Sequence, residues 1–90
     1  MADSGARYAL TRNALEIMTA WAAEGNSTDF AMQRLSVILT ERGGDPRDGT
    51  AELLAGFVNL CGAILMDEAT MTGEDEATIL QRVAIKVADK

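Results

Sequence analysis

Apolar residues recur every three or four positions in four segments of this chain, and glycines separate the segments. This spacing is typical of amphipathic helices, because residues three and four apart share one helix face. It predicts helices over about 5–24, 29–42, 50–72 and 74–89, with breaks at Gly25, Gly43–Gly44 and Gly73. No segment alternates apolar and polar residues over the length of a strand. We therefore expect an all-α, compact four-helix bundle-like domain that spans residues 1–90 as a single domain.

The segment 51–66, AELLAGFVNLCGAILM, is the most apolar part of the chain. On a helical wheel its large side chains form two adjacent stripes, which suits a central helix packed between two neighbours. The stripes are Leu53, Phe57, Leu60 and Ile64, then Leu54, Val58, Cys61 and Leu65. We expect Cys61 to be a buried small hydrophobe, and a single cysteine excludes an internal disulfide.

Small residues occupy the remaining side of this helix, and they suggest an interface. Gly56 and Gly62 each cost about 0.5 to 1 kcal/mol relative to alanine inside a helix, so close approach by a second chain would explain them. We expect Asn59 to belong to the same contact, although this side could simply face solvent. On the first helix, Tyr8 and Leu15 lie seven residues apart, either at the edge of the core or in an interface. A homodimer is one form that such contacts would take.

The net charge of −6 opposes binding to nucleic acid and to anionic membrane surfaces. Residues 48–90 hold three of the eight basic residues and eight of the 14 acidic ones. Asp67, Glu68, Glu74 and Asp75 form an acidic corner, which we expect either to meet a basic protein surface or only to increase solubility. The chain has no uninterrupted run of 18 apolar residues and no basic-then-apolar start, which predicts no membrane span and a cytoplasmic location.

Catalytic and metal-binding motifs are missing from the sequence. The chain has no histidine, so the commonest general base and metal ligand is absent, and one cysteine cannot form a zinc site. The acids of residues 67–76 do not follow the alternation of an EF-hand loop, and Gly43–Gly44 is not part of a phosphate-binding loop. We predict no catalytic residue, no cofactor and no metal. An acid-based site at Glu52 and Asn59 is the one enzymatic arrangement left open.

These observations favour a non-enzymatic protein-interaction module. It would act as an adaptor, inhibitor or assembly subunit, of the kind found among bacterial and phage accessory proteins, and bind another protein or itself. Two alternatives stay open. A bundle rich in methionine and leucine could hold a small apolar ligand, and an acidic surface could imitate nucleic acid in front of a protein that binds it.

Overall fold

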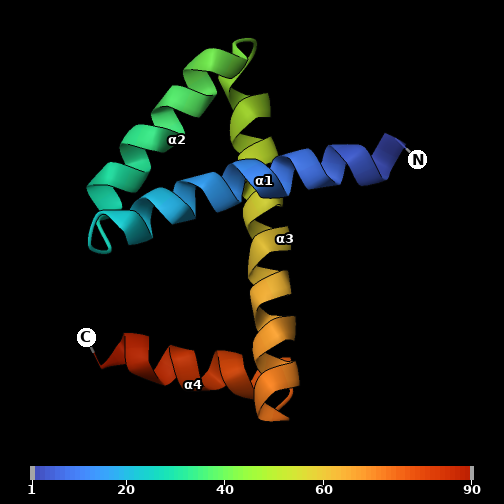
Figure 1. Cartoon of the computed structure of the whole chain (residues 1–90), viewed down its shortest axis with the longest axis vertical. Coiled ribbons are helices and arrows are strands. Elements are labelled where there is room, and N and C mark those ends of the chain that lie inside the picture. The colour runs from blue at the N-terminus through green and yellow to red at the C-terminus, as the bar shows by residue number, and fades with distance from the viewer. Residues whose placement is uncertain (1, 90) are drawn as a thin grey trace. The chain divides into compact units, whose positions relative to one another are not determined.

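The computed structural model describes the backbone of residues 2–89 and the side chains of residues 8–89. Within these residues it contains four helices and no strand (Figure 1). The helices are α1 (Ala2–Ala23), α2 (Thr28–Arg42), α3 (Pro46–Thr72) and α4 (Glu76–Ala88). The predicted all-α class with four helices is confirmed, and it is consistent with a bundle-like domain.

Side-chain caps and left-handed residues set most of the helix ends. After α1, Gly25 and Asn26 take φ values of 66° and 62°, a region that glycine and asparagine enter at least cost. The Ser27 hydroxyl accepts a hydrogen bond from the Phe30 amide at 3.2 Å and so caps α2. The Asp75 carboxylate does the same for α4, accepting from the Thr78 amide at 2.8 Å.

Helix α3 begins at Pro46, four residues before the start that was predicted near residue 50, so the predicted start was wrong. Pro46 occupies the first helical position, where its missing N–H costs nothing and its fixed φ suits the helix. The Asp45 carboxylate accepts from the Arg47 amide at 2.9 Å, and the Asp45 carbonyl accepts from the amides of Asp48 and Gly49. The Asp-Pro pair therefore starts the helix rather than continuing the loop.

Contacts divide the chain into two compact units, residues 1–60 and 61–90, and the division falls within α3. The first unit packs α1 and α2 with the beginning of α3 around Ile17, Ala31 and Leu53. Partly buried side chains surround this cluster: Trp21, Leu35, Ile38, Leu39 and Phe57. Of the two stripes predicted on the central helix, the one containing Leu53 and Leu60 supplies the buried residues here.

Two glycines of α3 allow close packing within the first unit. A Cβ atom added to Gly56 would lie 2.8 Å from the carbonyl carbon of Leu10 and closer still to its oxygen. Helix α1 therefore passes directly over Gly56, which is buried. The expectation that a second chain approaches at Gly56 is corrected, because α1 of the same chain fills that space. At Gly49, an added Cβ would lie 2.9 Å from Cδ2 of Leu39 on α2.

The second unit contains the end of α3 and α4. Arg82 on α4 donates to Glu74 at 2.5 Å and lies 4.0 Å from Glu68. Ile79 is the buried apolar residue of α4. The side chains of Leu80, Val83 and Val87 on the same helix are exposed.

Candidate protein-interaction site

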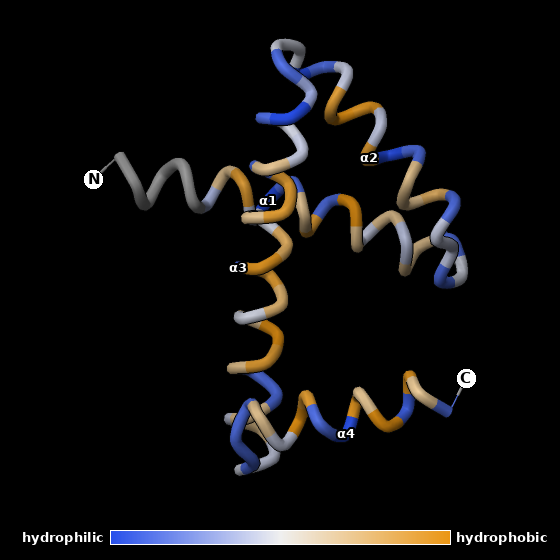
Figure 2. Tube along the Cα trace, turned by 180° about the vertical axis from the view of Figure 1, so that it is seen from behind, coloured by the Kyte–Doolittle hydropathy of each residue, from blue (hydrophilic) through white to orange (hydrophobic). Residues whose placement is uncertain are grey.

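A row of apolar side chains along α3 faces solvent. It consists of Leu54, Val58, Cys61 and Leu65, which we call the α3 seam. Leu54 and Val58 are 62% and 70% exposed, Cys61 is exposed and Leu65 is half-buried. The orange colour of the middle of α3 in Figure 2 shows how apolar this part of the chain is. The seam was predicted to pack inside the domain and Cys61 to be buried, and both predictions were wrong for this structure.

Helix geometry explains why Leu53 and Leu60 of one apolar stripe of α3 are buried whereas Leu54 and Val58 of the other are exposed, although Ile64 at the end of the first stripe is exposed as well. Neighbouring residues of a helix point about 100° apart, so the stripe of Leu53 and the stripe of Leu54 belong to different faces. Helices α1 and α2 pack on the first face, around Leu53 and Gly56. Leu54 and Val58 of the seam are exposed, so neither α1 nor α2 covers them.

A second apolar face lies on α1. Tyr8 and Leu15 are 67% and 51% exposed, so the second stripe predicted on this helix is outside the core. The guanidinium of Arg12 lies 6.0 Å from the centre of the Tyr8 ring, at the outer limit of a cation–π contact. Leu15 borders a shallow hollow with Arg12 and Thr19. Partner binding by Tyr8 and Leu15 stays a prediction.

Asn59 and Gly62, the other residues of the small side, are partly buried. Nothing lies within 4 Å of the position that a Cβ of Gly62 would take. This glycine therefore differs from Gly56, since no neighbouring element uses its missing side chain. A contact with a second chain at Gly62 and Asn59 stays a prediction.

The four residues of the acidic corner differ in their local contacts. Arg82 neutralises Glu74 and lies near Glu68, while Asp75 caps α4. The hydrogen bonds from Thr78 hold the pKa of Asp75 below its usual range. Among the described residues, the side chain of Asp67 is the one of these four that makes no hydrogen bond or ion pair. Most of the acidic corner thus has a structural role in the turn between α3 and α4.

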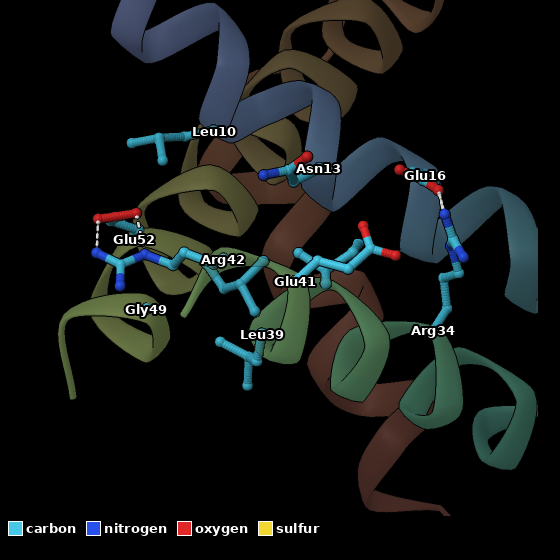
Figure 3. Close-up of a pocket in the computed structure, with 11 residues that line it drawn as sticks. Leu10, Asn13, Glu16, Arg34, Leu39, Glu41, Arg42, Gly49 and Glu52 are labelled. Atoms are coloured by element: carbon cyan, nitrogen blue, oxygen red, sulfur yellow. Dashed lines mark hydrogen bonds and ion pairs between the residues drawn. The ribbon is translucent and has the colours of Figure 1, made fainter. Parts of the chain in front are cut away.

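The first unit also contains a polar pocket of about 330 Å³ (Figure 3). An ion pair lies on each side of it: Arg34 donates to Glu16 at 2.7 Å, and Arg42 donates to Glu52 at 2.6 Å. Asn13 and Glu41 line the pocket between these pairs, above the side chain of Leu39. The sequence analysis did not find these ion pairs, because the partners are 18 and 10 residues apart and lie on different helices.

The electrostatics of this pocket do not resemble those of a general acid. Hydrogen bonds from Arg42 lower the pKa of Glu52, so this carboxylate stays ionised and is held by the guanidinium. The same pair raises the pKa of Arg42. Among the described residues, no group of three or more Cys, Asp or Glu side chains could hold a metal ion.

Helix α3 is long and apolar enough, by length and composition alone, to cross a membrane. The chain has no uninterrupted apolar run of 18 residues, and the expectation of no membrane span stays a prediction. A single helix of this kind is weak evidence, because core helices of soluble proteins pass the same test.

The chain matches no protein-family model, no curated protein and no solved structure.

Proposed function

We propose that this chain is a non-enzymatic protein-interaction module that binds another protein, or a second copy of itself, through exposed apolar helix faces. One observation carries the proposal: the α3 seam is exposed along several turns, next to a face of the same helix that is buried. Exposed apolar surface of this kind is typical of interaction sites. A cytoplasmic location is part of the proposal, and the free Cys61 fits a reducing compartment.

The pocket in the first unit gives less support to the alternative of a small apolar ligand. Sites for apolar ligands are lined mainly by hydrophobic and aromatic side chains. Here the lining includes Glu16, Glu41 and Glu52 together with two arginines. The acids of this pocket are mostly neutralised, which also weakens the case for catalysis.

The acidic corner gives limited support to imitation of nucleic acid. A mimic needs carboxylates that are free to meet a basic protein surface. Glu74 and Asp75 are already engaged within the chain, and Glu68 lies near Arg82. We therefore place the contact on the apolar seam, with the remaining acidic charge serving solubility.

The test compares two single substitutions on α3 that add the same charge. Val58→Glu changes the seam, whereas Ala63→Glu changes an exposed position about 180° away on the same helix. Far-UV circular dichroism first checks that both variants keep the wild-type helix content. The wild type and both variants are then tagged, and the proteins that each binds in the native cell are identified. The mass of each purified protein in solution is also measured, to detect self-association.

The proposal expects Val58→Glu to lose a stable partner, or self-association, that the wild type and Ala63→Glu retain. A wild-type chain that is monomeric at high micromolar concentration and binds no protein above background would refute it. Equal binding by Val58→Glu would refute the assignment of the contact to the seam.

A further inference from the structure

We infer that the partner of the α3 seam is the seam of a second copy of this chain, paired antiparallel to it. This inference rests on the proposed function, because it names the occupant of the same face. It follows from the spacing of the apolar residues and from the two charged residues at the ends of the seam.

The spacing is that of a helix–helix contact. Leu54, Val58, Cys61 and Leu65 follow one another at intervals of four, three and four residues. This alternation keeps apolar side chains along one narrow line of a helix, and it is the pattern by which two helices interlock. The buried face of α3 meets α1 and α2 instead, so packing within the first unit does not account for the pattern on the seam.

Opposite charges continue the seam at its two ends. Arg47 lies one heptad before Leu54, and Glu68 lies one heptad after Cys61, so both share the line of the seam. Arg47 is exposed, and no ion pair involves its side chain among the described residues. Glu68 is also exposed, and its ion pair with Arg82 is long, at 4.0 Å. Arg47 is therefore free to meet a partner, and Glu68 can leave its long ion pair with Arg82 to do so.

This charge pattern selects one orientation for a pair of copies. In a parallel pair, Arg47 would lie beside Arg47 of the second copy and Glu68 beside Glu68, so like charges would repel at both ends. In an antiparallel pair, each arginine approaches the glutamate of the other copy. The two-fold symmetry of such a dimer makes this favourable contact twice.

The antiparallel pair also matches apolar residues to one another. When Val58 lies opposite Cys61 of the second copy, Leu54 lies opposite Leu65, and the two-fold axis passes between positions 59 and 60. Arg47 then lies four residues, about 6 Å along the axis, from the level of Glu68 in the second copy. Side chains as long as arginine and glutamate span that offset.

Sedimentation velocity over a range of concentrations, at low and at moderate salt, tests the inference. We expect the wild type to dimerise, and Val58→Glu to weaken the dimer at least about 100-fold, because a carboxylate would be buried twice. Ala63→Glu, which places the same charge away from the seam, should leave the dissociation constant unchanged. Both variants alter exposed positions, and circular dichroism verifies their folding.

Charge reversal tests the orientation. Arg47→Glu alone and Glu68→Arg alone should each weaken the dimer about tenfold, and the double variant Arg47→Glu with Glu68→Arg should restore it. Rescue requires that the two positions meet between copies in opposite directions. The antiparallel pairing would be overturned if the double variant lost as much dimerisation free energy as the two single variants together.

Other results separate this inference from the proposed function. A wild type that stays monomeric but loses a different bound protein on Val58→Glu overturns self-pairing and leaves the interaction module intact. Cosedimentation of the wild type with phosphatidylcholine vesicles, abolished by Val58→Glu, would overturn both in favour of a lipid surface. A dimer unaffected by Val58→Glu would overturn the seam as the contact.

Discussion

Replacement of Gly56 by alanine offers the sharpest test of the packing in the first unit. The added methyl group would lie 2.8 Å from the carbonyl carbon of Leu10, and closer to its oxygen, whereas carbon atoms in contact lie about 3.5 to 4.0 Å apart. The obstacle is backbone, so no side-chain rotation relieves the overlap. Helices α1 and α3 must separate by about 1 Å at this point.

Two opposing terms set the size of the effect. Alanine favours a helix interior over glycine by about 0.5 to 1 kcal/mol. Overpacking in a tight contact costs about 1 to 3 kcal/mol, and a forced backbone shift belongs at the upper end of that range. We therefore expect Gly56→Ala to reduce the free energy of unfolding by about 1 to 2 kcal/mol, which lowers Tm by about 5 to 15 °C in a chain of this size.

Gly62→Ala provides a matched control on the same helix. Nothing lies within 4 Å of its added Cβ, so only the helix preference acts and Tm should rise by about 3 to 6 °C. Thermal unfolding followed by circular dichroism, at one protein concentration because association would shift Tm, compares the two variants with the wild type. If Gly56→Ala melts at or above the wild type, α1 does not pass over Gly56 as described.

Three further predictions concern caps, charge and the cysteine. Ser27→Ala should lower the free energy of unfolding by about 1 kcal/mol, because the Phe30 amide loses its acceptor. Ser27→Asp should keep the cap and the wild-type free energy, and urea unfolding curves measure both variants. The hydrogen bonds from Arg42 that lower the pKa of Glu52 stabilise the fold above the unfolded-state pKa, and this stabilisation is lost as the pH falls from about 5 through the depressed folded-state value. The difference in Tm between wild type and Glu52→Gln should therefore shrink in acid, and a constant difference would contradict the ion pair. Cys61 should react with a thiol reagent in the native state at protein concentrations where sedimentation shows a monomer, and complete protection of that monomer would contradict its exposure.

The helices could be predicted from the sequence because their signals are local. The apolar spacing, the stop at Gly25 and the break at Gly73 each act within a few residues, and α1, α2 and α4 begin and end within three residues of the predicted positions. The early start of α3 was also written locally, in Asp45 and Pro46, but the nearby glycines led to its interpretation as a loop.

The use of each apolar face could not be predicted in the same way. Two stripes of α3 have equal apolar character, and only the folded chain shows that α1 and α2 cover the stripe of Leu53 and not that of Leu54. Gly56 and Gly62 looked equivalent in the sequence, yet α1 crosses Gly56 while nothing lies within 4 Å of an added Cβ at Gly62. The ion pairs of Arg34 and Arg42 join separate helices, so their partners follow from tertiary structure alone.

The close approach at Gly56 also fixes the register between two helices. Sliding α1 along α3 by one helical turn would bring the Leu10 carbonyl over position 52 or position 60, which hold Glu52 and Leu60. Either residue carries a Cβ, and no neighbouring turn has another glycine on that line of the helix. Because Gly56 has no side chain, the backbone of α1 can approach α3 closely at this one position. The position of α1 along α3 is therefore fixed by a glycine, in a core with few large side chains.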